Sequence, residues 1–292
     1  MTMKLLLLGS TGLLGSTLGP YLRSCEYEVL THSRSERSQF QVDLDDTIKT
    51  YEMLDRISPD SIINLAALTD VDLCEIEPNK AFLANVRTIE NISNWINQRR
   101  SSCHLVHIST DQVYDSVCLH TEDSVKLTNY YGFSKYAGEL AASSIPSTIL
   151  RTNFFGRSRC SNRSSLTDWL YRSLTRSDFI EVFDDVMFSP LSMSTVSEMI
   201  ELSVRYRPVG VFNLGSHNGM SKSDLAFSFA DKVGLSTNTM KRTKTNQVSF
   251  LKAYRPKDMR MDSDKIERIL GIKLPSLIDE IEQAAEDYYE IK

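Results

Sequence analysis

The sequence predicts an α/β protein in which a doubly wound parallel sheet is joined to a smaller C-terminal lobe. Over residues 1–155, short apolar segments alternate with stretches of helical periodicity. The apolar segments are continuous rather than alternating, which is typical of strands buried on both faces of a sheet. After residue 155 the alternation loosens into polar loops and helices, with one more buried segment at 209–216.

The expected elements follow one another in the order that parallel strands joined by helices require. Strands are expected at 4–10, 27–33, 39–43, 61–67, 103–110, 147–155 and 209–216. Helices are expected at 12–24, 47–57, 78–97, 131–144, 165–176, 220–234 and 274–290. Ser221, with Asp224 three residues later, is a capping signal for one of these helices. The stretch 235–262 is polar and is expected to be irregular.

Composition excludes several classes of protein. The chain has 292 residues, of which 41% are hydrophobic and 24% charged, and its formal net charge is −5. Nothing here favours a nucleic-acid partner, which would select a basic surface. The apolar run at 5–9 is too short for a membrane span, so we expect no membrane association. The five scattered cysteines form no C-x-x-C pair, which indicates reduced thiols in a cytoplasmic protein.

The segment LLLLGSTGLLGS places Gly9, Gly12 and Gly15 between the first strand and the first helix. Glycine here permits a tight turn, close approach of the backbone to a pyrophosphate, and close packing of the helix on the sheet. The N–H groups at the helix N-terminus would bind the phosphates. A ligand-free turn is the alternative interpretation. We therefore expect a Rossmann-type nucleotide-binding domain at 1–155 and a substrate-binding lobe at 156–292, with strand 209–216 returning to the core sheet.

The end of the second strand bears on the identity of the cofactor. An NAD enzyme of this architecture usually places an acidic residue there, bonded to the ribose hydroxyls. In this chain Ser33 and Arg34 stand at that position, and Arg37 is close. A cationic group would pair with a 2′-phosphate, so the sequence predicts NADP(H). A solvated basic turn is the alternative.

The segment NYYGFSKYAGE contains two adjacent tyrosines. Residues four apart lie on one face of a helix, so Tyr131 and Lys135 can meet, whereas Tyr130 and Lys135 are five apart. The preceding buried strand ends in HISTD and supplies a hydroxyl at its carboxyl end, from Thr110 or Ser109. On the opposite face of this helix, Phe133, Ala137 and Leu140 are expected to pack on the sheet.

These residue types suit the reduction of a carbonyl group. A carbonyl that accepts a hydride needs a proton, which Tyr131 can donate. A neighbouring Lys135 ammonium would bring the pKa of the tyrosine closer to neutral pH, and it can also hold the nicotinamide ribose. The Thr110 hydroxyl would orient the carbonyl.

With these motifs assembled, the chain resembles the extended short-chain dehydrogenase/reductases and, among them, the dTDP-4-dehydrorhamnose reductase family. The resemblance covers nearly the whole chain. It rests on GSTGLLGS and on segments 63–78, 108–115, 130–139, 150–156, 183–192 and 255–266. Gln112 departs from the family, which usually has an aromatic residue there, and so does RTNFF at 151–155. The glutamates of the family's metal-linked dimer have no counterpart here, so we expect no metal.

The resemblance implies a role for each matching residue. Tyr131 would be the proton donor, Lys135 its partner and Thr110 the orienting hydroxyl, with Ser109 in support. Cofactor contacts are implied at Gly9, Thr11, Gly12, Leu13, Leu14, Gly15, Ser33, Arg34, Asp43, Leu44, Ala66, Ala67, Thr69, Tyr131 and Lys135. Substrate contacts are implied at Val71, Thr110, Asp111, Gln112, Asn153 and Arg255.

The implied activity is the NADPH-dependent reduction of a nucleotide-linked 4-keto-6-deoxy sugar, in deoxysugar and surface polysaccharide synthesis. A nucleotide-sugar epimerase is a second interpretation, although the thiol that such enzymes of GDP-fucose synthesis carry after the fifth strand is absent from STDQVYD. A third is a non-catalytic NADP-binding subunit, like the regulatory subunit of methionine adenosyltransferase. The sequence leaves open which nucleotide and sugar bind, and whether the chain forms a homodimer.

Overall fold

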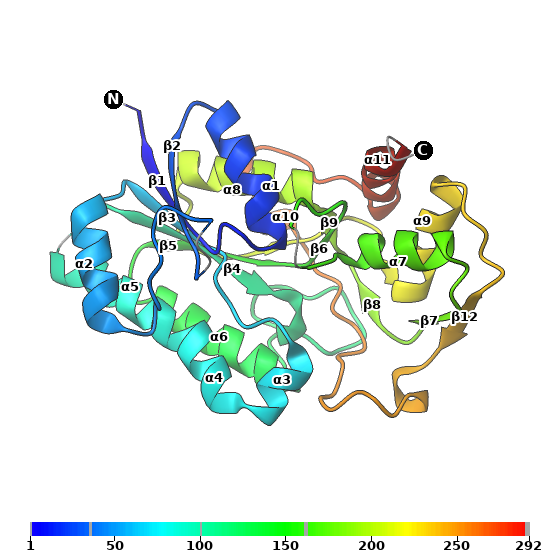
Figure 1. Cartoon of the computed structure of the whole chain (residues 1–292). Coiled ribbons are helices and arrows are strands. Elements are labelled where there is room, and N and C mark those ends of the chain that lie inside the picture. Colours follow the sequence, from blue (N-terminus) through cyan, green and yellow to red (C-terminus); the bar gives the residue numbers. More distant parts are fainter. Residues whose placement is uncertain (1, 35–36, 100, 161–162, 290–292) are drawn as a thin grey trace.

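Six parallel strands form the central sheet of the computed structural model, which describes residues 2–34, 37–99, 101–160 and 163–289 (Figure 1). Their order across the sheet is β10-β5-β4-β3-β1-β2. The strands are β1 (Lys4–Leu8), β2 (Glu28–His32), β3 (Ser61–Asn64), β4 (His104–Thr110), β5 (Ser147–Thr152) and β10 (Gly210–Leu214). Because β2 and β3 lie on opposite sides of β1, the sheet is doubly wound, and the predicted fold class is confirmed.

Helices cover both faces of this sheet (Figure 1). One face carries α2 (Thr47–Ile57), α5 (Thr88–Arg99) and α6 (Tyr130–Ala142), and the other carries α1 (Leu13–Ser24), α8 (Met193–Tyr206) and α10 (Asp264–Leu270). Strand β1 shows why its sequence is uniformly apolar. Leu5 and Leu7 pack in the core on the α1 side, and Leu6 and Leu8 in the core on the α2 side.

A smaller lobe lies beyond the carboxyl ends of the strands (Figure 1). Its helices are α7 (Leu166–Thr175), α9 (Lys222–Lys232) and α11 (Leu277–Tyr289). Three strand pairs complete it: β6 (Phe154–Phe155) with β9 (Leu191–Ser192), β7 (Ile180–Phe183) with β12 (Met240–Thr243), and β8 (Met187–Phe188) with β11 (Met220–Ser221). The segment expected to be irregular, 235–262, therefore contains a strand. The predicted cap of α9 is confirmed, since Asp224 N donates to Ser221 Oγ over 3.0 Å.

The predicted strand 39–43 is reduced to a single bridge between His32 and Phe40. Two backbone bonds form here, from Ser33 N to Phe40 O and from Phe40 N to Thr31 O. Side chains compete for the neighbouring donors: Thr31 N donates to Gln39 Oε1 over 2.9 Å, and Ser33 N also donates to Ser38 Oγ over 3.0 Å. Local competition of this kind disfavours a longer regular strand.

The predicted helix 78–97 is interrupted by a π-helical turn. It consists of α4 (Pro78–Phe82), the turn η1 (Leu83–Arg87) and α5, and a short helix α3 (Val71–Ile76) precedes it. The turn places Asn85 between two parts of the site. Its amide accepts from Leu68 N over 2.7 Å and donates to Ser134 Oγ over 2.9 Å, so it connects the loop after β3 to α6.

The expectation for the buried face of α6 was wrong. Phe133 and Leu140 are 53% and 58% exposed, whereas Tyr131 and Gly138 are buried. Helix α6 approaches η1 through its small residues, and the ideal Cβ of an alanine at 138 would overlap the carbonyl oxygen of Asn85. The buried face of α6 is therefore determined by its close backbone contact with η1 and not by the size of its apolar side chains. None of the described helices combines the length and apolar character that a membrane crossing needs.

Replacing Gly138 with alanine should destabilise the protein by about 1–3 kcal/mol, because the backbone of η1 must move to admit the methyl group. Gly19→Ala is the matched control within a helix. Its new methyl would lie 3.5 Å from Leu7 Cδ2, an ordinary contact, and should stabilise by up to about 1 kcal/mol. Urea denaturation measures both. Equal effects of the two substitutions would contradict the close packing of α6.

Candidate active site

A cleft of about 260 Å³ opens at the carboxyl ends of the strands, where the sheet order reverses between β1 and β3. Open α/β sheets bind their ligands at this position. The predicted residues that line the cleft are Gly9, Gly12, Leu13, Leu14, Gly15, Ala67, Thr69, Ser109, Thr110, Gln112, Tyr131, Lys135 and Asn153. The structure thus places the glycine-rich turn around the same cavity as Tyr131 and Lys135, which lie more than a hundred residues later in the sequence.

The glycine-rich turn has the geometry of a phosphate cradle. Gly9 has a φ of +79°, which favours glycine, and a Cβ there would lie 2.9 Å from Ala66 N. A Cβ at Gly15 would overlap the carbonyl oxygen of Gly9, so α1 begins directly against the turn. No side chain caps the N-terminus of α1 at Gly12. Its amide donors and the positive end of the helix dipole therefore suit an anionic group such as a pyrophosphate.

Tyr131, not Tyr130, faces the cleft. Tyr131 is 8% exposed and lines the cavity, whereas Tyr130 is 47% exposed on the outer side of α6. Asn129 caps the helix by accepting from Gly132 N over 2.7 Å, which fixes where the first turn begins. Lys135 follows one turn later and donates from Nζ to Ile108 O over 2.6 Å. The Thr110 side chain is close enough to that of Tyr131 to lower its pKa.

Burial dominates the charge states of this group. It raises the pKa of Tyr131 well above its ordinary value, although the Thr110 side chain acts in the opposite direction. It lowers the pKa of Lys135 to about 8, against the field of Glu139. The expected lowering of the tyrosine pKa by Lys135 is therefore not observed in this structure, where burial raises that pKa. Tyr131 is protonated at neutral pH, which is the state that a proton donor requires.

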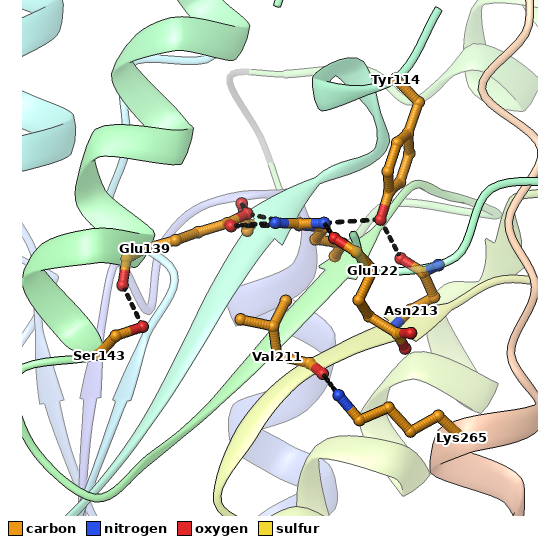
Figure 2. Close-up of polar contacts among 9 residues, drawn as sticks. Tyr114, Glu122, Glu139, Ser143, Val211, Asn213 and Lys265 are labelled. Carbon is orange, nitrogen blue, oxygen red and sulfur yellow. Dashed lines mark hydrogen bonds and ion pairs between the residues drawn. The ribbon is translucent and has the colours of Figure 1, made fainter. Parts of the chain in front are cut away.

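A buried ion pair joins α6 to the sheet behind the site (Figure 2). Arg151 of β5 donates from NH2 to Glu139 Oε2 over 2.7 Å, and both side chains are almost fully buried. The same guanidinium donates to Tyr114 OH over 2.7 Å and to Glu122 O over 2.6 Å. Figure 2 shows Tyr114, Asn213 and Glu122 together on one side, with Glu139 on the other. Ser109 also donates to Glu139.

The other predicted substrate residues lie around Thr110 and Tyr131. Asp111 is buried beside Thr110 and accepts from Asn153 Nδ2 over 2.8 Å. Burial raises the pKa of Asp111 to about 6. Val71 packs with Tyr131 in one small apolar cluster. Arg255 reaches the core domain from the lobe and donates from NH2 to Asp72 Oδ2 over 2.8 Å.

Other predicted contacts lie outside the walls of the cleft: Thr11, Ser33, Arg34, Asp43, Leu44, Ala66, Val71, Asp111 and Arg255. Leu44 packs in the apolar core. The end of β2 adjoins the glycine-rich turn, because His32 O accepts from Gly9 N over 2.9 Å. Ser33 and Arg34 come directly after His32, so they lie near the glycine-rich turn. Their contacts with a cofactor stay predictions.

Five lining residues were missed from the sequence: Leu65, Ile108, Thr152, Phe154 and Arg163. The first four lie at or just beyond the carboxyl ends of β3, β4 and β5. The rule that ligands bind at those ends could have found them. Arg163 comes from the loop before α7, and no local signal marks it.

Comparison with known proteins identifies the family. The sequence profile of the family described as "RmlD substrate binding domain" matches residues 3–290. The chain belongs to this family. A dTDP-4-dehydrorhamnose reductase of Sinorhizobium fredii is 30% identical over 243 residues, which make up 75% of this chain and 77% of that protein. The predicted resemblance is thereby confirmed.

Two further matches extend over almost the full length. A probable low-salt glycan biosynthesis reductase of Haloferax volcanii, Agl14, is 28% identical over 299 residues, covering 96% of this chain and 97% of that protein. The crystal structure of a hypothetical dTDP-4-dehydrorhamnose reductase from Sulfolobus tokodaii is 30% identical and superposes with a TM-score of 0.84. That match covers 95% of this chain and 98% of the other.

Glu139→Gln should destabilise the protein by about 3–5 kcal/mol, because it leaves the buried Arg151 guanidinium without a carboxylate. Glu181→Gln is the matched control. Glu181 pairs with Lys241 over 2.9 Å at the surface, so its loss should cost less than about 1 kcal/mol. Chemical denaturation at pH 7 compares the two. A loss at Glu139 no larger than at Glu181 would show that the buried pair does not support the fold.

Asp111→Asn should stabilise the protein at pH 7 but not at pH 4. The folded-state pKa of Asp111, about 6, lies above its ordinary 3.8, so the folded state holds the proton longer and stability falls as pH rises from about 4 to 6. Above that pH range the buried carboxylate lowers the free energy of unfolding by roughly 3 kcal/mol. Asparagine has no charge and avoids this loss. Unfolding free energies of both proteins across pH 4–7 test this. A difference that stays constant with pH would refute the assignment.

Proposed function

We propose that this protein is an NADPH-dependent reductase of a nucleotide-linked 4-keto-6-deoxy sugar, acting in deoxysugar or polysaccharide synthesis. The observation that carries the proposal is the meeting of Tyr131, Lys135 and Thr110 with the glycine-rich turn around one cleft. Membership of the family supports it, as do the reductases among the similar proteins.

The residues fit a dinucleotide cofactor. The cradle at Gly9 and Gly15 has no room for a Cβ, and the uncapped start of α1 offers donors to a pyrophosphate. Arg34 is exposed next to the end of β2, where an acidic residue would select NAD. A guanidinium there suits a 2′-phosphate, which favours NADP(H). NADPH, when bound, supplies the hydride.

The side chains then perform three tasks on the substrate carbonyl. The Thr110 hydroxyl hydrogen-bonds the carbonyl oxygen and orients it. As negative charge develops on that oxygen, the Tyr131 hydroxyl gives up its proton, so that the ketone becomes an alcohol. The Lys135 ammonium, held in place by Ile108 O, stabilises the tyrosinate that remains. Tyr131 is 8% exposed, and electrostatic interactions are stronger where a side chain is removed from water.

Tyr131→Phe should lower kcat for the oxidation of NADPH by dTDP-4-keto-6-deoxy sugars by about 100-fold or more, since the proton donor is lost. Tyr130→Phe is the matched control and should leave kcat within about twofold, because the exposed ring of Tyr130 does not face the cleft. Absorbance of NADPH measures both.

Equal losses in the two variants would contradict the assignment of Tyr131. If the wild type binds NADPH tightly but oxidises it with no nucleotide-linked keto sugar, the reductase proposal fails in favour of a cofactor-binding subunit.

A further inference from the structure

Lys222 is a cation of the lobe that is close enough to Asp111, beside Thr110, for the two charges to interact. It is the first residue of α9, where its backbone N donates to Val186 O over 2.9 Å. The neighbouring pair of β8 and β11 aligns Ser221 with Met187. The side chain extends across β8, and Nζ lies 5.7 Å from the centroid of the Phe188 ring. Hydrogen bonds therefore hold the backbone at Lys222, and its ammonium lies over the Phe188 ring.

Among the described residues, Lys222 has no carboxylate within ion-pair distance, in contrast to three cations of the neighbouring segment 255–260. Arg255 pairs with Asp72 over 2.8 Å, Lys257 with Asp185 over 2.6 Å, and Arg260 with Asp258 over 2.6 Å. No corresponding carboxylate or carbonyl accepts from Lys222 Nζ in the described chain. Its one close partner is an aromatic ring, which offsets only part of the loss of water around a cation.

Two further features make this an unfavourable place for a positive charge. Lys222 is half-buried, and burial lowers its pKa. It also stands in the first turn of an 11-residue helix, the end at which the helix dipole disfavours cations. A serine or an acidic residue would be more stable here. A lysine at this position therefore needs a compensating interaction that the described residues do not supply.

The surroundings indicate what that interaction is. The charged side chains whose fields act on Lys222 are Asp111, next to Thr110, and Arg255. The segment that carries Arg255 runs beside β8, because Met187 N donates to Lys257 O over 2.7 Å. Lys222 thus belongs to the part of the lobe that lies nearest Asp111 and the reacting end of the cleft. The glycine-rich turn, where cofactor phosphates would bind, belongs to a different part of the site.

We propose that Lys222 binds the diphosphate of the nucleotide-sugar substrate, an inference that rests on the proposed function and adds a residue to it. A diphosphate diester carries two negative charges beside the sugar that must reach Tyr131. A charge-assisted hydrogen bond from Nζ to a phosphate oxygen offsets the desolvation of the ammonium, which a neutral sugar hydroxyl would not do. Arg255, which donates to Asp72, is a second cation of the lobe near Lys222.

Calorimetric titration of the NADPH-loaded protein with dTDP, UDP and thymidine tests the proposal. Lys222→Met should weaken the binding of dTDP and UDP by about 10- to 100-fold, since a hydrogen bond to a charged group is lost. Thymidine has no phosphate, and its affinity should not change. Lys222→Arg should restore a large part of the diphosphate affinity. Lys232→Met, on the same helix but paired at the surface with Glu282, is the control and should bind all three as the wild type does.

The proposal is overturned if Lys222→Met binds dTDP and UDP as tightly as the wild type does. It is also overturned if the variant loses thymidine or NADPH in equal measure, or if the wild type binds neither diphosphate. Thermal denaturation of each variant shows whether it is folded.

Failure of the proposed function gives a different result. In that case the wild type binds dTDP or UDP and Lys222→Met does not, yet no keto sugar is reduced. Conversely, reduction with an unchanged KM in Lys222→Met would leave the reductase standing without this role for Lys222.

Discussion

The buried pair of Arg151 and Glu139 is the interaction on which the site depends most. A guanidinium in the interior is tolerated only when its donors are satisfied, and here Glu139, Tyr114 and the Glu122 carbonyl share them. These acceptors come from α6 and from the segment after β4, whereas the arginine belongs to β5. Satisfying one charge therefore fixes the helix and the loop relative to the sheet.

The same pair reaches the catalytic group by a short route. Glu139 is one helical turn after Lys135, and its charge opposes the lowering of the Lys135 pKa by burial. Glu139 also accepts from Ser109, which precedes Thr110 in β4. One carboxylate, that of Glu139, thus supports the three residues proposed to act on the substrate, which are Tyr131, Thr110 and Lys135. Such support matters because hydrogen-bond donors act in catalysis only when they are held before the charge develops.

Two charged residues near the cleft reduce stability where they stand. Asp111 is a buried carboxylate, and Lys222 is a half-buried cation without an ion-pair partner among the described residues. Each is unfavourable for folding alone, and each is chemically suited to a polar, charged ligand. The apolar cores on the two sides of the sheet and in the lobe compensate for these sites.

By itself, the sequence determined the elements whose causes are local. Continuous apolar runs gave the parallel strands, the glycine spacing gave the turn before α1, and helical periodicity chose Tyr131 over Tyr130 as the partner of Lys135. Tertiary structure decided what depends on distant partners. Phe133 and Leu140 face outward because Gly138 allows α6 to contact the backbone of η1. The sequence of α6 alone does not indicate that η1 is its neighbour. Arg151, Arg163 and Lys222 acquired their roles in the same way, because a charge has meaning only through the groups that the fold places around it.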